Sequence, residues 1–261
     1  MTTGYRAALA AELLKARRSK MPLLTFLVMA AAGGVAGLFM FVLSDPEQAR
    51  RMGLLDQKAQ LSGLTADWAG LLGFLAQIVA VGGLFVYAFI AVWVFGQEFT
   101  SGTLRYLLAL PVPRRTIVLA KFTVTAVWCA AVTLWLAAVV LLVGLALDLP
   151  GASAALLRDG LARTAAAAAL MLLVTTPAAL VVCAARSHLA ALAATVGALV
   201  LAQVAATLGH GDLFPWSVPA VAAGLAPGTA LGPAALAVVF LTAAAGVLGT
   251  TRWWQSGHAG N

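Results

Sequence analysis

Three histidines are the side chains best suited to metal binding or proton transfer, and they lie far apart along the chain. His188, His210 and His258 fall in three different segments, whereas a metal site needs several ligands that converge. The chain also contains no His-Glu-x-x-His, no Gly-x-Ser-x-Gly and no Asp-rich pair, the patterns used by metalloproteases and hydrolases. We therefore predict neither catalytic residues nor metal ligands here.

The composition indicates which elements hold these side chains. Hydrophobic residues make up 62% of the 261 residues and charged residues only 10%, whereas a soluble domain usually has about 25% charged residues. Cutting the sequence at every Asp, Glu, Lys and Arg leaves six long runs, at 21–44, 68–97, 122–147, 164–185, 187–211 and 213–251. Each run exceeds the ~20 residues that a helix needs to cross a bilayer. A soluble globule is excluded.

The predicted fold is one all-α integral membrane domain, 1–261, with six transmembrane helices. Unbroken apolar runs differ from the alternating pattern of barrel strands. Residues 1–20 resemble an amphipathic helix at the membrane interface, and prolines divide the last run. We predict spans at 22–43, 68–95, 122–147, 164–185, 189–208 and 233–251, an outer loop at 44–67, a coupling loop at 97–115 and a re-entrant segment at 213–230.

The cationic residues predict the orientation. If the chain starts in the cytoplasm, eleven of the sixteen Lys and Arg residues are cytoplasmic and five are outside, which agrees with the positive-inside rule. Both termini are then cytoplasmic. These cations cluster beside span ends, where they meet lipid headgroups, so the net charge of +7 does not indicate a nucleic-acid partner.

Few polar residues lie within the runs. An ion-coupled carrier usually has an acid or a lysine within a span. None of the six runs has one in its interior. Gln77 and Gln203 are the deepest polar residues, and they either join helices by hydrogen bonds or line a pathway. Gly33 and Gly37 allow another helix to approach closely, which makes them candidates for a dimer seam, although glycine is common in membrane helices.

The segment between the second and third spans has an apolar face that a cytoplasmic loop seldom needs. Leu104, Leu107, Leu108 and Pro111 follow helical spacing. The interpretation without a binding partner is that this helix lies on lipid and that Glu98 is a solvated acid at a helix end. Arg114, Arg115 and Lys121 follow, and we expect them among the headgroups.

This segment resembles the cytoplasmic loop of ABC-2 type permeases, the membrane subunits of ATP-binding-cassette exporters. The family pattern is a Glu, a Gly-Thr, an Arg-x-Leu-Leu run, a Pro-x-x-Arg and a downstream Lys. It is matched by Glu98, Gly102, Thr103, Arg105, Leu107, Leu108, Pro111, Arg114 and Lys121. The Glu-Leu-Leu-Lys-x-Arg-Arg at 12–18 is similar to the amphipathic first helix of the family. The similarity covers essentially the whole chain.

The resemblance implies a coupling helix that inserts into a groove of a separate nucleotide-binding subunit. The coupling residues would be Glu98, Gly102, Thr103, Leu104, Arg105, Leu107, Leu108, Pro111, Arg114 and Arg115. Because the chain has no Gly-x-x-x-x-Gly-Lys-Ser/Thr, we expect that it does not hydrolyse ATP unaided. The resemblance implies that it is not an enzyme by itself and binds no cofactor, and that ATP and Mg belong to the partner.

The implied assembly has two ATPase subunits and a second permease copy or paralogue in a prokaryotic plasma (inner) membrane. The implied function is export, with the permease dimer forming the pathway. The alternatives are a secondary carrier and a membrane scaffold that transports nothing. The family handles drugs, peptide antibiotics, polysaccharides, lipids and ions, and the sequence does not select among them.

Overall fold

The structure is a computed structural model that describes residues 2–45, 51, 65–104, 107, 112–226 and 231–256. Its described part is helical, with no strand. The elements are α1 (Thr2–Arg18), α2 (Met21–Ser44), α4 (Trp68–Gln77), the π-helical turn η1 (Ile78–Gly82), α5 (Gly83–Thr100), α7 (Arg114–Ala146), α8 (Ala154–Ala185), α9 (His188–Thr207), α10 (Val218–Ala222) and α11 (Pro233–Gln255).

Six helices in this part of the chain are long and apolar enough to cross a membrane, which confirms the predicted number of spans. α4, η1 and α5 together form the second of them, Trp68–Thr100. α7 and α8 begin earlier than the predicted spans, at Arg114 and Ala154, because both helices begin with a stretch that contains charged residues, including Arg115 in α7 and Arg158 in α8. The predicted outer loop lies largely outside the described residues.

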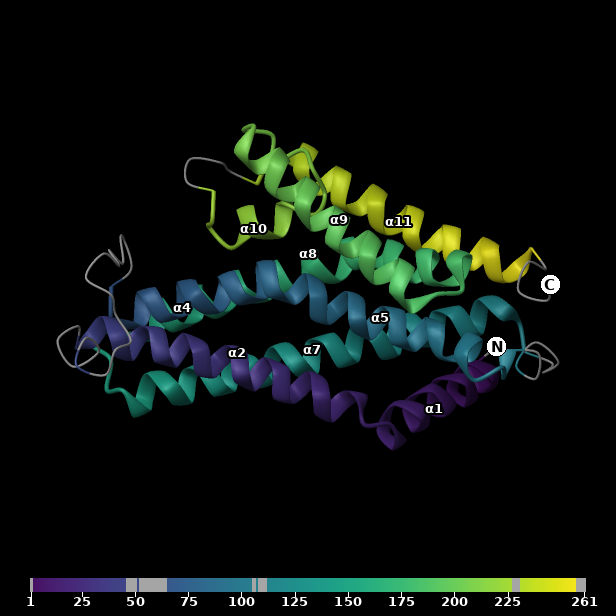
Figure 1. The fold of residues 1–261 in the computed structure, drawn as a ribbon, viewed down its shortest axis with the longest axis horizontal. Coiled ribbons are helices and arrows are strands. Elements are labelled where there is room, and N and C mark those ends of the chain that lie inside the picture. Colours follow the sequence, from purple (N-terminus) through teal and green to yellow (C-terminus); the bar gives the residue numbers. More distant parts are fainter. Residues whose placement is uncertain are drawn as a thin grey trace.

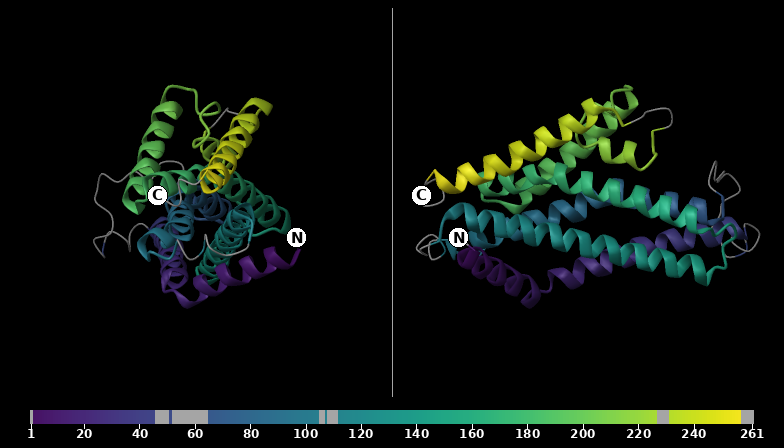
Figure 2. Two further views of the ribbon diagram at one scale, coloured as in Figure 1. Left: turned by 90° about the vertical axis from the view of Figure 1, so that its right-hand side faces the viewer. Right: turned by 180° about the vertical axis from the view of Figure 1, so that it is seen from behind.

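The helices form an elongated bundle with both termini at one end (Figure 1). α8 packs against α4, α5, α9, α10 and α11, and α2 packs along α7. The end-on view in Figure 2 shows α9 and α11 on one side of the bundle and α1, α2 and α7 on the other. We call the end with the termini the terminal end. The opposite end, with the turn between α7 and α8, is the distal end.

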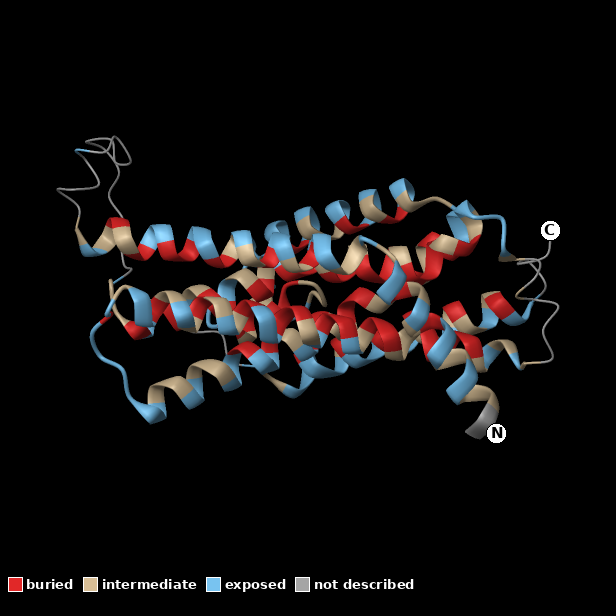
Figure 3. Ribbon diagram, turned by 90° about the horizontal axis from the view of Figure 1, so that it is seen from below, coloured by how far each residue is buried: buried red, intermediate tan, exposed pale blue. Residues whose placement is uncertain are grey.

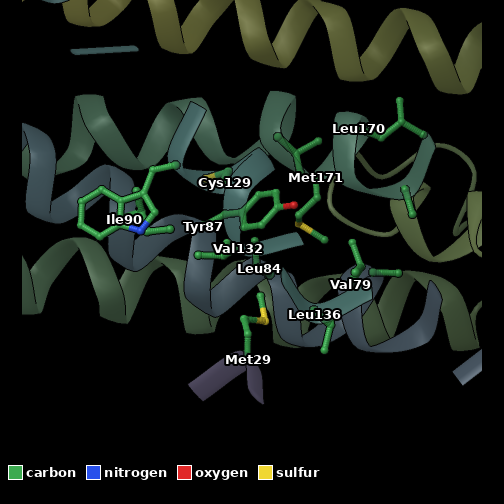
Figure 4. Close-up of a cluster of buried hydrophobic side chains, with 14 of the residues drawn as sticks. Met29, Val79, Leu84, Tyr87, Ile90, Cys129, Val132, Leu136, Leu170 and Met171 are labelled. Carbon is green, nitrogen blue, oxygen red and sulfur yellow. The ribbon is translucent and has the colours of Figure 1, made fainter. Parts of the chain in front are cut away.

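Each long helix buries one face and exposes another (Figure 3). The buried side chains form a continuous core at the centre of the bundle, which includes Leu84, Tyr87, Met171 and Leu136 (Figure 4). The Tyr87 hydroxyl forms a hydrogen bond with the Thr133 hydroxyl, so this buried polar group is satisfied. The outward faces carry exposed leucines, valines and phenylalanines, as expected for contact with lipid.

α8 passes Pro177 without a break because a neighbouring side chain replaces the lost hydrogen bond. Proline has no N–H to donate to the carbonyl of Leu173, and the Thr176 hydroxyl lies 2.9 Å from that carbonyl oxygen. The same hydroxyl lies 3.2 Å from the carbonyl oxygen of Ala243 on α11. A Cβ at Gly246 would lie 2.7 Å from the Pro177 nitrogen. The close approach of α11 to α8 therefore requires glycine at 246.

The connection between α8 and α9 is short. Arg186 adopts left-handed backbone angles, with φ of 51°, and so ends α8. The Ser187 hydroxyl accepts a hydrogen bond from the Ala190 N–H at 3.3 Å, which caps the first turn of α9. The segment predicted to be re-entrant contains α10, a helix of five residues that packs against α8.

Candidate functional site

The apolar stripe of α1 faces the protein. Ala16 is buried, and Leu9 and Leu13 are half-buried against the core, where α1 packs along α7. The Tyr5 hydroxyl also contacts the Thr123 hydroxyl of α7 at 2.8 Å. Glu12 lies within this stripe and is only 3% exposed, so the first helix carries a carboxylate into the bundle.

Four charged side chains meet at the terminal end, and we call them the Glu–Lys cluster: Glu12 and Lys15 of α1, Glu98 of α5 and Lys121 of α7. Lys121 Nζ lies 2.7 Å from Glu98 Oε1 and 3.1 Å from Glu12 Oε2. Lys15 Nζ lies 2.6 Å from Glu12 Oε1 and 2.9 Å from Glu98 Oε1. The cluster joins three helices with two carboxylates and two ammonium groups, so its charges balance.

Burial makes this cluster costly to disrupt. Glu98 is 1% exposed and Lys121 0% exposed. Lys121 also donates to the carbonyl of Val94 at 2.7 Å, whereas Glu98 Oε2 is buried with no hydrogen-bond partner among the described residues. Removing one partner of a buried ion pair costs about 3–5 kcal/mol, because the other charge remains buried.

The position of Lys121 corrects one expectation and that of Glu98 excludes the solvated-acid interpretation. We expected Lys121 among lipid headgroups, but its ammonium group is enclosed by the two carboxylates. α7 begins before Lys121 and α5 continues past Glu98, so both charges lie inside helices. Cutting the sequence at charged residues placed them at span ends, because a single sequence does not show which charges neutralise one another.

Lys15 is the member of the cluster nearest to solvent, with a side chain 36% exposed. Burial alone would lower the pKa of the Lys15 ammonium, but the carboxylates of Glu98 and Glu12 outweigh it and hold the pKa above its ordinary value of 10.5. Lys15 thus remains cationic at neutral pH. The sequence analysis did not assign Glu12 and Lys15 to the site, and the signal that could have found them is an acid within an apolar stripe.

Further contacts tie α11 and the start of α9 to the same end. Arg114 at the start of α7 donates to the carbonyl of Trp254 at 3.1 Å, and Trp254 is fully buried. Its indole N–H points at Cys183 Sγ of α8, 3.4 Å away. His188 packs directly over Gly96, since a Cβ there would lie 2.5 Å from His188 Nε2. Helices α5, α7, α8 and α11 are therefore in contact around the cluster.

The predicted coupling residues begin in the last turn of α5, at Glu98, and end in the first turn of α7, at Arg114 and Arg115. Gly102 has φ of +65°, a conformation that favours glycine, and it is exposed together with Thr103 and Arg115. Leu104 and Leu107 are half-buried and pack against the core. The coupling residues outside the described part are Arg105, Leu108 and Pro111.

The two glutamines predicted for a pathway or a helix contact line the same cavity, of about 310 Å³. Gln77 is the last residue of α4 and Gln203 lies near the end of α9. The two glycines considered for a dimer seam are instead buried against α7 of the same chain. A Cβ at Gly33 would lie 2.7 Å from Val139, and one at Gly37 would lie 2.8 Å from Val143.

Comparisons with known proteins agree with the resemblance found in the sequence. Residues 8–202 match the family model described as "ABC-2 family transporter protein". The chain is also 27% identical over 140 residues to the bacitracin transport permease protein BCRB of Bacillus licheniformis. That match covers 54% of this chain and 67% of the relative.

Proposed function

Because the chain belongs to the ABC-2 family of transporter proteins, we propose that it is the permease subunit of an ATP-driven exporter. It is a multi-pass membrane protein, and its family implies association with an ATP-binding subunit. We assign ATP hydrolysis, with its ATP and Mg²⁺, to that partner, since the chain has no Gly-x-x-x-x-Gly-Lys-Ser/Thr segment. The permease itself then provides the path and is not an enzyme.

The Glu–Lys cluster is the observation that carries this proposal. The connection between α5 and α7 leaves α5 directly after the turn with Glu98 and enters α7 about two turns before Lys121. Glu98 and Lys121 form ion pairs with each other and with Lys15 and Glu12 of α1. Both ends of the connection are therefore held to the group of helices α1, α5 and α7. A push on the connection by the ATP-binding subunit therefore moves α1, α5 and α7 together.

The buried position of Glu98 assigns its role within this mechanism. A carboxylate that is 1% exposed does not itself contact a second protein, so Glu98 transmits force between helices. Docking falls to exposed residues of the connection, Gly102 and Thr103, and to Arg115 in the first turn of α7. Closure of two ATP-binding subunits would tilt the attached helices and switch access to the path.

A second permease, a copy or a paralogue, completes the path in this proposal. α9 is the least buried of the six long helices, and Leu189, Val196, Val200 and Leu201 on it are exposed. Closed two-fold pairing is the commonest way to build such an assembly. The exposed face of α9 is therefore a more suitable seam than the buried glycines of α2.

A secondary carrier is the competing function, and the Glu–Lys cluster is its only candidate for ion coupling among the described residues. A coupling group must gain and lose its charge or its ion during transport. Here two carboxylates face two ammonium groups at 2.6–3.1 Å, so each charge already has a partner of opposite sign within the protein. We therefore prefer coupling to ATP over coupling to an ion gradient.

The test is substrate flux in vesicles that contain the permease with the ATP-binding subunit that copurifies with it. Bacitracin, named in the relative, is the first substrate to measure. We expect flux that requires ATP hydrolysis and stops when the phosphate-binding lysine of the ATPase is replaced. Flux that persists without ATP and follows an ion gradient would establish a carrier instead.

Variants at two exposed residues test docking of the ATP-binding subunit in the same assay without affecting the folding of the permease. Thr103→Trp alters the exposed connection and Arg115→Glu the exposed start of α7, so we expect both to weaken flux and copurification of the ATPase while the permease remains folded. Arg158→Glu is the matched control, because Arg158 is 76% exposed at the distal end and pairs only with the neighbouring Asp159 among described residues. Equal loss in all three variants would refute docking at this connection.

A further inference from the structure

A cavity near the distal end differs from the other large cavities in its polar groups. It lies between the junction of α4 with η1, the end of α9 and the segment around α10, and has a volume of about 310 Å³. Gln77 and Gln203 line it from two different spans, and Ser217 and Gly211 line it from the connection after α9. Among the residues that the structure describes, the lining includes no Asp, Glu, Lys, Arg or His.

The two glutamine amides are available for a ligand. Both side chains are exposed in the structure, and neither makes a hydrogen bond to any other described residue. Ser217 is already satisfied, since its hydroxyl lies 2.6 Å from the Gly211 carbonyl oxygen and 2.8 Å from that of Phe214. Each amide offers two N–H donors and an oxygen acceptor, and leaving such groups unpaired in an apolar medium is unfavourable.

In two other large cavities, the hydroxyls that line the cavity are already hydrogen-bonded to backbone carbonyls. The cavity beside Leu172 and Phe122 includes Thr125 and Thr175, but both hydroxyls donate to carbonyls of their own helices. The cavity between α2, α5 and α9 contains only Thr25 as a polar residue, and its hydroxyl donates to the Pro22 carbonyl. These cavities are suited to lipid chains.

The backbone around the glutamine cavity is also irregular. Gln77 directly precedes the π-helical turn Ile78–Gly82, and turns of this type occur often at functional sites. On the opposite wall, Gly209 has φ of +78°, and the described residues 208–226 contain only the five-residue helix α10. Irregular backbone at membrane depth is tolerated where it lines a cavity.

We propose that this cavity binds the transported molecule through an uncharged group that both donates and accepts hydrogen bonds, an amide or a hydroxyl. This inference rests on the proposed function of the chain as a permease. A charged group would meet no counter-charge in the described lining, whereas a neutral amide can pair with each glutamine. The volume holds one such portion of a larger amphipathic molecule.

Protection of a cysteine in the cavity tests this proposal on the full-length permease in membrane vesicles. Ala206 lines the cavity and is exposed, so Ala206→Cys is the reporter, labelled by a small water-soluble thiol reagent. Leu208→Cys, exposed but outside the lining, is the control reporter. The probes are N-acetyl-leucinamide, its anionic analogue N-acetyl-leucine, its cationic analogue leucinamide, and octyl glucoside as the hydroxyl probe.

We expect N-acetyl-leucinamide or octyl glucoside to slow labelling of Ala206→Cys but not of Leu208→Cys, and the charged analogues to protect far less. Gln77→Leu and Gln203→Leu in the reporter background should each weaken protection about fivefold, as for the loss of one hydrogen bond. Thr207→Val, outside the lining, is the matched control. Protection by the amide identifies an amide ligand, and protection by the glucoside alone identifies a hydroxyl ligand.

Three results would overturn the proposal: no labelling of Ala206→Cys, no protection by either neutral probe, or equal protection by the charged analogues. The readout involves neither ATP nor flux, so its failure is distinct from failure of the proposed function. A permease with ATP-dependent flux and no protection at Ala206→Cys would retain its function and lose this site.

Discussion

Lys121 Nζ lies 2.7 Å from Glu98 Oε1 and 3.1 Å from Glu12 Oε2, so one ammonium group of α7 binds carboxylates from both α5 and α1. The three helices are distant in sequence, and the ion pairs hold them at one end of the bundle. Because the cluster is buried, its charges stabilise the fold only as a balanced set. Neutralising one member of the Glu–Lys cluster should therefore destabilise the fold more than replacing all of its charges together.

Replacing Lys121 with Met should destabilise the permease by about 3–5 kcal/mol, because two buried carboxylates then share one ammonium group. Glu98→Gln should also destabilise it, with the opposite imbalance. The double variant should lose less than the sum of the two, because Glu12 and Lys15 remain as a balanced pair. Denaturation of the purified permease in mixed detergent micelles gives the three values.

The control for these variants is Lys20→Met, at an exposed lysine beyond the end of α1. An exposed substitution of this kind changes stability by about 0.5 kcal/mol or less. Two results would contradict the described role of the ion pairs in joining the helices. One is that Lys121→Met destabilises the permease no more than Lys20→Met does. The other is that the stability loss of the double variant equals the sum of the two single losses.

The charge of Lys15 predicts a pH dependence. Its pKa is raised above the ordinary value of 10.5 in the folded permease. A raised pKa gives stability that is fully present below the unfolded pKa and is lost as the pH rises through the folded pKa. The stability difference between the natural chain and Lys15→Gln should therefore be constant between about pH 6 and pH 9 and should shrink only at higher, strongly alkaline pH.

This difference should be modest and salt-dependent, since the Lys15 side chain is 36% exposed and solvent screens exposed charges. Thermal unfolding of both proteins at several pH values measures it. A difference that disappears near neutral pH would mean that Lys15 is not held in its charged form by Glu12 and Glu98.

The sequence predicted the part of each helix that crosses the hydrocarbon of the membrane, because that part must be apolar. The predicted spans at 22–43 and 189–208 lie close to α2 and α9, because their limits coincide with polar residues at the membrane edge. The predicted starts at 122 and 164 came too late, since α7 and α8 continue beyond the apolar run as charged helix. Apolar length gives the crossing but not the full helix.

The site was less predictable than the fold. The motif around Glu98 and Lys121 was visible in the sequence, but their contact with Glu12 depends on the docking of α1, which local patterns do not encode. Gln77 and Gln203 were each recognisable as polar residues within a span. That they share one cavity follows only from the packing of α9 against α5 and α8 and of α10 against η1 and α8.

The close contact between α11 and α8 gives a prediction at Gly246. A Cβ there would lie 2.5 Å from Thr176 Oγ1 and 2.7 Å from the backbone nitrogen of Pro177, and the backbone cannot move aside without disturbing α8. Gly246→Ala should therefore destabilise the permease by about 1–3 kcal/mol, despite the better helix propensity of alanine. Thermal unfolding in detergent measures the change.

Gly197 provides the matched control for this variant. It lies within α9, and a Cβ there would meet nothing within 4 Å. Gly197→Ala should be neutral or slightly stabilising. Equal effects of the two alanines would show that the approach of α11 to α8 is looser than the structure has it.

The orientation of the bundle can be tested with two engineered cysteines at its opposite ends. Ala152 is exposed in the distal turn between α7 and α8, and Gln255 is exposed at the end of α11 beside the C-terminus (Figure 1). The natural cysteines, Cys129 and Cys183, are buried and give little background. A membrane-impermeant maleimide should label Ala152→Cys in intact cells and Gln255→Cys only after permeabilisation, because the sequence predicts eleven of the sixteen cationic residues on the side of the termini. The opposite pattern would invert the bundle, and it would also place the connection between α5 and α7 outside the cell, away from ATP.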